Sequence, residues 1–519
     1  MALTGAASRN ATAAALVRNP APQAVTPQMF GTAIAGRDCL PAVRAMLEHL
    51  RSQGGGVARF PPLDGDGYQL SDTIVIDFSN CEIELEENVR LTKRTKAACF
   101  FFSGARSAYL RNVGIRGIGG LRTVDGNARN MRGFAYALHD TLYGCVQFRH
   151  VRGWHASYLY GYNGLVNGIR AIECADGLVD HCEASHARFD NGVTIDHDPT
   201  DILWSSGNST SWANTRVRDV RCWANQSFGA ASYAASGTIF ERVAAFDNGD
   251  DTNASLVSQG GGISAEHNAL DPSHMSRNHA VQIIDCTAVR NRNNALWVTA
   301  AGTMVQGGSF SDTVAPRVRS NRTGLYGFNV AIVASGSATI KGARIERGAS
   351  GGIYLLATAH GKPSLSFDGE ITSSGGIGIQ ARGIAALTTS PQSQITGSGH
   401  GKGHHGVYVS NLGRAYNQGQ GRVRLAGVIS GSGDQAVQIE YVAEADLSGS
   451  RFRNNGGSVV AGAANTRAAL ADGVVNTDQN RKNLYIISLA PSVESATVRN
   501  VTGDSLVAPS LNLAHYKRP

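Results

Sequence analysis

One short pattern returns along the chain and constrains its fold more than any other feature: a small residue, an apolar residue, a variable residue and a second apolar residue. Seven segments carry it: GVTIDH (192–197), GISAEH (262–267), ALWVTA (295–300), GIYLLA (352–357), GIGIQA (376–381), GVYVSN (406–411) and AVQIEY (436–441). Apolar residues at every second position indicate a strand with one face in a core. The fragments return after about 22–30 residues, which is typical of a repeat architecture.

A second column of short strands ends in turn residues: ARFDNG (187–192), AAFDNG (244–249), AVRNRN (288–293) and SRFRNN (450–455). Asp, Asn and Gly tolerate left-handed backbone and bond their own turn amides. Short strands, polar corners and no helical period predict an all-β parallel solenoid, whose coils stack about 4.8 Å apart. Residues 140–465 leave room for about 12–14 coils. The alternative, an antiparallel sandwich, would need hairpin turns between nearly all neighbouring strands.

Composition supports a packed, folded chain and excludes several classes of protein. Charged residues make up 17% and hydrophobic residues 42% of the 519 residues, which argues against disorder. The net charge of +7 comes without a dense Lys/Arg run, so no nucleic-acid partner is expected. The eight cysteines form no C-x-x-C pair, so we expect buried, reduced thiols and no metal site. No apolar run approaches a membrane span and no secretory leader is visible, so we expect synthesis in the cytoplasm and no membrane insertion.

The front end predicts a helix that covers the open end of the solenoid. Asp38 can cap a helix at 39–50, with Pro41 in its first turn. Its apolar stripe consists of Leu40, Val43, Met46, Leu47 and Leu50. The glycines at 54–56 end it.

With this helix, the opening resembles a known superfamily. The segments VTPQMFG (25–31), QGGGVARFPP (53–62), GYQLSDTIVI (67–76) and IELEENVRL (83–91) are similar to the start of pectate-lyase-like right-handed parallel β-helices. They resemble in particular the branch of bacteriophage tailspikes and depolymerases. GTAIAGRDCL (31–40) departs from that family, which has a run of acidic residues here.

The resemblance implies a single-stranded right-handed β-helix that forms a homotrimer in a phage tail. It also implies that the protein acts, without a cofactor, on a polysaccharide at the surface of the bacterial host. The Ala-rich residues 1–24 would then be an arm that binds a tail or baseplate protein, although a frayed terminus explains them equally well. Residues 25–140 would form the cap and first coils, and 141–465 the main β-helix with the glycan site. From 466 to 519 the repeat fades, which predicts a small C-terminal β region for trimerisation or for the tip.

Two acid–histidine pairs recur at one point of the coil and are the main candidates for catalysis. Asp196–His197 and Glu266–His267 end equivalent strands, and alternation turns the acids outward. One coil, FGAASYA (228–234), lies between them and offers Ser232 or Tyr233. Two coils separate backbones by about 9.6 Å, close to the spacing of the acids in an inverting glycosidase. The histidines would orient a carboxylate or act as a base.

Other acids and aromatics extend this hypothesis. Asp250 and Asp251 follow a corner and can replace either catalytic acid. The two FDNG segments are expected at equivalent places in the coil, with Asp190, Asn191, Asp247 and Asn248 mostly as turn residues. Trp297, Tyr354 and Tyr408 continue the outward column and, with Tyr233, offer faces for sugar rings. The alternative for these aromatics is packing between subunits or under a loop. The alternative for the acids is a solvated surface or a cation site.

The sequence therefore predicts a polysaccharide depolymerase that works by hydrolysis with paired carboxylates. A lyase ranks lower because no Arg or Lys pair is visible beside the acids. A non-catalytic receptor-binding virion protein is the alternative from another class, and it would tolerate loss of every acid named. A free-standing pectinase-like enzyme is disfavoured by the missing leader.

Overall fold

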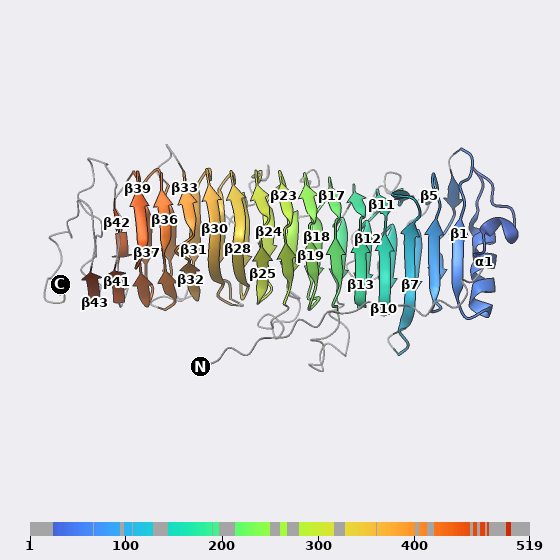
Figure 1. The fold of residues 1–519 in the computed structure, drawn as a ribbon, viewed down its shortest axis with the longest axis horizontal. Coiled ribbons are helices and arrows are strands. Elements are labelled where there is room, and N and C mark those ends of the chain that lie inside the picture. Colours follow the sequence, from blue (N-terminus) through green and yellow to red (C-terminus); the bar gives the residue numbers. More distant parts are fainter. Residues whose placement is uncertain are drawn as a thin grey trace.

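The protein forms one long rod of stacked coils, seen in a computed structural model (Figure 1). The structure describes residues 24–456 except 66, 94–97, 106, 128–143, 189, 197–212, 250–259, 267–279, 316–326, 360, 400–403 and 413–419. It also describes strands at 460–463, 468–472, 475–476 and 495–499. Strands follow one another along the rod in chain order, with helix α1 (Leu40–Ser52) at one end.

Two parallel sheets form the walls of the rod. Sheet B takes one strand from each coil: β3 (Ile74–Ile76), β6 (Phe100–Ser103), β9 (Val146–Arg149), β12 (Ile169–Ile172), β15 (Val193–Asp196), β18 (Phe228–Tyr233), β21 (Gly261–Glu266), β24 (Asn294–Val298), β27 (Phe328–Val333), β29 (Gly351–Leu356), β31 (Ile377–Arg382), β34 (Val407–Ser410), β37 (Val437–Glu440) and β40 (Val460–Ala463). Twelve of its fourteen strands, β9 to β40, lie within residues 140–465, which agrees with the 12–14 coils predicted for that range.

Sheet A has two arms, to which most coils contribute two short strands and some a single long one. Its strands are β1 (Gly56–Phe60), β2 (Tyr68–Leu70), β4 (Cys81–Leu85), β5 (Arg90–Lys93), β7 (Leu110–Gly117), β8 (Arg122–Asp125), β10 (Val151–Ser157), β11 (Leu159–Tyr162), β13 (Ala175–Asp180), β14 (Glu183–Ser185), β16 (Arg216–Arg218), β17 (Arg221–Trp223), β19 (Ile239–Glu241), β20 (Ala244–Phe246), β22 (Gln282–Ile284), β23 (Thr287–Val289), β25 (Thr303–Gln306), β26 (Ser309–Ser311), β28 (Ser337–Glu346), β30 (Ser364–Thr372), β32 (Ala386–Thr389), β33 (Gln394–Thr396), β35 (Arg422–Arg424), β36 (Gly427–Ser430), β38 (Glu444–Asp446), β39 (Ser450–Arg453), β41 (Ala468–Asp472), β42 (Val475–Asn476) and β43 (Ser495–Arg499).

The predicted repeat is confirmed, with one shift in alignment. All seven predicted segments contribute strands to sheet B, and Val193, Ala230 and Ile263 pair across successive coils as expected. Ile353, however, pairs with Ile379 and not with Ile377. A pattern with a period of two stays in phase after a slip of two residues, so the sequence alone does not fix this register.

The predicted capping helix is also confirmed. A short helix, η1 (Pro27–Met29), precedes α1, which contacts β1 and β3 of the first coil. All five residues of the predicted apolar stripe are buried. The N-cap residue is Cys39 and not Asp38 as predicted. The Asp38 carboxylate accepts hydrogen bonds from the Leu40 and Ser71 amides, each at 3.1 Å, and so ties the start of the helix to the first coil.

A buried asparagine ladder shapes one corner of the rod. Asn225, Asn248 and Asn291 follow β17, β20 and β23, and each is fully buried. Asn225 Nδ2 donates to Asn248 Oδ1 at 2.9 Å, and Asn248 Nδ2 donates to Asn291 Oδ1 at 3.0 Å. Gly229 packs against this ladder, because a Cβ at this position would lie 2.9 Å from Asn248 Nδ2.

The two FDNG segments do not lie at equivalent places, contrary to expectation. Phe246, the first residue of the second FDNG segment, pairs with Trp223, and Trp223 pairs with Ser185. The position equivalent to Phe246 two coils earlier is therefore Ser185, which precedes the first FDNG segment (189–192). Asp247 has a φ of 55° and its exposed carboxylate pairs with Arg290, which fits the expected turn role. Asp190 instead lies in the corner between β14 and β15.

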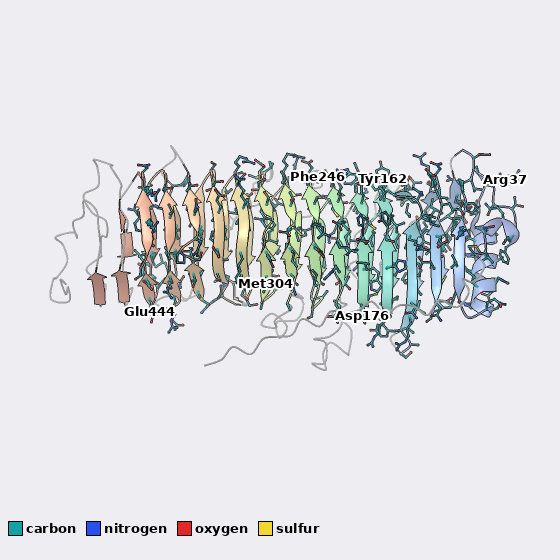
Figure 2. All side chains as sticks on the ribbon, viewed as in Figure 1. Arg37, Tyr162, Asp176, Phe246, Met304 and Glu444 are labelled. Carbon is teal, nitrogen blue, oxygen red and sulfur yellow. The ribbon has the colours of Figure 1, made fainter. Side chains whose placement is uncertain are left out.

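Stacked side chains line the outside of sheet A. Tyr160 stacks on Trp223 with ring centroids 5.4 Å apart, and Trp223 on Phe246 at 5.7 Å. Because these ring faces cover one another, the stack supports the coils and offers no free face for a sugar in its middle. Figure 2 shows Tyr162 and Phe246 along one long edge of the rod and Asp176, Met304 and Glu444 along the opposite edge.

The strands beyond residue 465 continue the β-helix. Strand β41 pairs in parallel with β38, and β43 pairs in parallel with β41, so the described strands up to residue 499 belong to further coils and not to a separate fold.

The remaining features of the fold concern its cysteines and helices. All eight cysteines are buried with free thiols, as expected. Among the described helices, none has the length and hydropathy needed to span a membrane.

Candidate active site

The outer face of sheet B brings the two predicted acids to one wall. Asp196 ends β15 and pairs with Tyr233 at the end of β18, which pairs in turn with Glu266 at the end of β21. The three side chains therefore form one row across three successive coils. Ser232 is fully buried, so of the two candidates in the middle coil Tyr233 faces outward.

Asp196 is held by an arginine from the preceding coil. The Arg170 Nη2 atom of β12 lies 2.6 Å from Asp196 Oδ2, and the two side chains are only 11% and 16% exposed. An ion pair this close and this sheltered is a charge-assisted hydrogen bond that favours the ionised carboxylate. Arg170 pairs in register with Thr194, so it crosses diagonally to reach Asp196.

A third carboxyl group, Asp190, joins the cluster although the sequence indicated only a turn. Asp190 Oδ2 accepts a hydrogen bond from the fully buried Asn167 Nδ2 at 3.1 Å, and the same Nδ2 bonds Thr194 Oγ1 at 2.8 Å. Burial raises the pKa of Asp190 to about 6; Arg170 and Asn167 lower it and the nearby charge of Asp196 raises it.

Glu266 is the group most suited to carry a proton at neutral pH. Burial raises its pKa to about 7, a hydrogen bond from Ser264 Oγ lowers it, and the Asp190 carboxyl raises it. A carboxylic acid held protonated near the working pH is what a general acid requires. Asp190 thus interacts electrostatically with both Asp196 and Glu266.

Tyr233 connects the row to the corner that carries Asp190. Its hydroxyl oxygen accepts a hydrogen bond from Asn191 Nδ2 at 3.1 Å. Asn191 is fully buried, and its Oδ1 accepts from the Phe228 amide at 2.8 Å. Asn191 is therefore more than a turn residue, since it fixes the Tyr233 ring between the acids.

The other predicted site residues have different outcomes. His197, Asp250, Asp251 and His267 lie outside the described residues. Trp297 and Tyr354 do point outward from sheet B, but the expectation that they are exposed is wrong.

These two side chains are 4% and 1% exposed, within a second hydrophobic cluster that includes Phe328. Tyr354 stacks on Phe328 with centroids 5.0 Å apart. This agrees with the packing alternative. Tyr408 is partly buried and stacks on His405 at 5.7 Å.

One group of potential metal ligands occurs among the described residues, away from these acids. Asp180, His181 and Asp219 place ligand atoms within 4.8 Å of one another on sheet A. Arg218 pairs with Asp180 at 2.9 Å, and Arg242 pairs with both oxygens of Asp219. Because arginines already neutralise both carboxylates, this group does not fit a cation.

Comparison with known proteins bears on the fold alone. No family model and no curated protein matches the chain. Among solved structures, the N-terminal fragment of gene product 12 of bacteriophage phi29 aligns with a TM-score of 0.50 and 11% identity, over 92% of this chain and 86% of that one. The chain is a right-handed parallel β-helix.

Two weaker likenesses complete the comparison of this β-helix. The A-module of the Azotobacter vinelandii mannuronan C-5 epimerase AlgE6 aligns at a TM-score of 0.38 and 13% identity, over 93% of this chain and 99% of that one. DFA-IIIase from Arthrobacter chlorophenolicus A6 aligns at 0.36 and 9%, over 90% and 95%. The predicted fold class is confirmed.

Proposed function

We propose that the β-helix hydrolyses glycosidic bonds at the cluster of Glu266, Asp190 and Asp196. The observation that carries the proposal is a partly buried carboxyl group, Glu266, with a pKa of about 7, which lies near a second carboxyl group, Asp190, and an ion-paired third, Asp196. Glu266 gives its proton to the glycosidic oxygen as the bond to the anomeric carbon breaks. An ionised aspartate takes a proton from the water that attacks this carbon, so the protons balance.

The proposed substrate is a bacterial surface polysaccharide, and the proposed setting is a phage tail. The resemblance of residues 25–91 to tailspike openings and the likeness in fold to a phage gene product support this setting. The same resemblance supports a homotrimer, a main site within residues 141–465 and an N-terminal arm that binds the tail. The row of Asp196, Tyr233 and Glu266 crosses three neighbouring strands of sheet B, so it offers polar groups to a polymer that lies along the rod.

A polysaccharide lyase is the second candidate function, and one contact in the structure supports it. Arg170 lies 2.6 Å from Asp196, although the sequence showed no basic residue beside the acids. In a lyase, Arg170 would neutralise a uronate, the Tyr233 phenolate would take the C5 proton, and the Glu266 carboxylic acid would give its proton to the leaving glycosidic oxygen. Products with the ultraviolet absorbance of an unsaturated uronate would identify this chemistry, whereas hydrolysis releases reducing ends without it.

Replacement of Glu266 with Gln tests hydrolysis directly. The variant keeps the size of the side chain but has no proton to give, so we expect reducing-end release from a panel of bacterial polysaccharides to fall by at least about 100-fold. Binding of the same glycan should persist. Turnover equal to that of the wild type would refute the assignment, and a glycan that the wild type binds but leaves intact would support a receptor-binding role instead.

Glu440→Gln is the matched control. Glu440 also ends a strand of sheet B and accepts a hydrogen bond from a side chain two residues earlier, Gln438. It lies far along the rod from Asp190 and Asp196, so its replacement should leave turnover unchanged.

A further inference from the structure

Arg170 stands between two aspartates and bonds only one of them in the contacts that the structure specifies. Its Nη2 atom is 2.6 Å from Asp196 Oδ2. Asp190 Oδ2 instead accepts a hydrogen bond from Asn167 Nδ2 at 3.1 Å. Its interaction with Arg170 is a charge–charge attraction without a hydrogen bond. Asn167 donates also to Thr194, so the Asp190 carboxyl group is fixed beside the ion pair without entering it.

The charged and titratable groups around Arg170 come from every neighbouring strand. Arg149 lies on β9 on one side, with the paired residues His150 and Glu173 at the adjoining corner. Asp190 and Asp196 lie on the other side, followed by Tyr233 on β18 and Glu266 on β21. Among the described basic residues in this set, Arg170 forms an ion pair with the row of Asp196, Tyr233 and Glu266, through Asp196.

A base that removes a proton from water must have a free lone pair and an affinity for protons close to that needed at the working pH. Asp196 shares its Oδ2 with a guanidinium group, which makes it a poor proton acceptor. Asp190 has no guanidinium bond among its specified contacts, and it interacts electrostatically with Glu266. The two aspartates therefore differ in what they can do.

We propose that Arg170 is a positioning residue that divides the work between the aspartates: it holds Asp196 as a permanent carboxylate and leaves Asp190 as the carboxyl group that works opposite Glu266. This inference rests on the proposed hydrolysis for its catalytic part. The division of charge itself is a property of the free protein. In the reaction, Asp190 would take the proton of the attacking water, while the Arg170–Asp196 pair keeps its charge throughout.

Carbon-13 NMR of labelled aspartate side chains tests the division of charge without any substrate. Signals are assigned by their loss in Asp190→Asn and Asp196→Asn. In the wild type, the Asp190 signal should titrate near pH 6. In Arg170→Gln, we expect the Asp190 midpoint to rise by about one unit or more, because the guanidinium charge that lowers its pKa is gone. Arg170→Lys, which keeps the charge, should restore most of the wild-type behaviour.

An unchanged Asp190 midpoint in a folded Arg170→Gln protein would overturn the division of charge. Circular dichroism of each variant establishes folding, and Arg170→Lys provides the comparison if Arg170→Gln does not fold. For a glycan that the wild type cleaves, Asp190→Asn should lower kcat at least about 100-fold and Asp196→Asn clearly less. The reverse order would overturn the role of Asp190 while leaving hydrolysis intact. NMR shifts as expected with no glycan cleaved would refute hydrolysis and keep the division of charge.

Discussion

At the scale of single residues, environment gives three similar carboxyl groups three different characters. Asp196 is ion-paired, Asp190 is partly buried beside that pair, and Glu266 is partly buried next to a hydroxyl donor. Acid and base roles in an active site are separated by such differences in surroundings. The row of Asp196, Tyr233 and Glu266 is therefore useful only together with Arg170 and Asp190.

The pH dependence of turnover follows from these surroundings. Glu266 must be protonated, so kcat should fall as the pH rises above about 7. Asp190 must be ionised, so kcat should also fall as the pH drops below about 6. A pH–rate profile should thus be a narrow bell between these limits, whose apparent values belong to the coupled pair. A rate that keeps increasing up to pH 9 would contradict Glu266 as the acid.

Lys93 predicts an effect on stability far from the site. It is fully buried with a hydrogen bond to Thr73, and burial lowers its pKa to about 8. Between pH 8 and about 10.4 the unfolded chain binds more protons at Lys93 than the folded chain does, so the free energy of unfolding rises with pH in this range. Below pH 8 Lys93 is charged in both states, and the full cost of burying its charge lowers the stability of the fold. Lys93→Met should therefore stabilise the protein by about 2–3 kcal/mol at pH 7, by the size of that shift.

Denaturant unfolding at several pH values checks this expectation. The gain of Lys93→Met over the wild type should shrink as the pH approaches 10. Exposed Lys341→Met serves as the control and should change stability little at any pH. A Lys93→Met protein that is less stable than the wild type at pH 7 would show that the buried charge is better compensated than its contacts indicate.

Sequence reasoning identified the row of acids but not their neighbours, and the reason is physical. Alternation along a strand fixes which side chains face outward, so Asp196 and Glu266 could be placed. Asp190 stands in a corner, where the same four letters, FDNG, occur at two different points of the coil. Arg170 lies one coil away within an unremarkable IRAI segment, and only the register shows what it contacts.

At the scale of elements, corners decide how coils stack. The asparagine ladder satisfies buried backbone carbonyls: Asn248 Nδ2 bonds the Cys222 carbonyl at 3.1 Å, and Asn291 Nδ2 bonds that of Ala245 at 2.9 Å. Each amide thus supports the coil before it. Trp297 and Tyr354 show the limit of prediction at this scale, since alternation gives their direction but not whether another segment packs on them.

Removal of one rung of this ladder should be costly. Asn248→Ala would leave the Asn225 backbone amide and the Cys222 carbonyl without the Asn248 side chain as a partner, which predicts a loss of about 2–6 kcal/mol in the free energy of unfolding at about 1–3 kcal/mol per orphaned group. Denaturant unfolding measures it. Asp247→Asn, which removes only an exposed ion pair with Arg290, should cost less than about 1 kcal/mol. Equal losses in the two variants would contradict the role of the ladder.

At the scale of the whole molecule, the rod turns distance in sequence into closeness in space. Asp190, Tyr233 and Glu266 lie on three successive coils, and parallel pairing holds their strands about 4.8 Å apart. The sequence predicted this stacking because the apolar period repeats. It did not predict that the coils continue to Arg499, where the repeat becomes too irregular to recognise.

The central claim is that a glycan is cleaved on the outer face of sheet B at Glu266. The most direct measurement is a crystal structure of Glu266→Gln with an uncleaved oligosaccharide from a polysaccharide that the wild type degrades. We predict that a glycosidic oxygen lies within hydrogen-bonding distance of the amide at position 266, with Asp190 on the opposite side of the anomeric carbon. An oligosaccharide bound only to sheet A, or on sheet B with no glycosidic bond near these residues, would contradict the account.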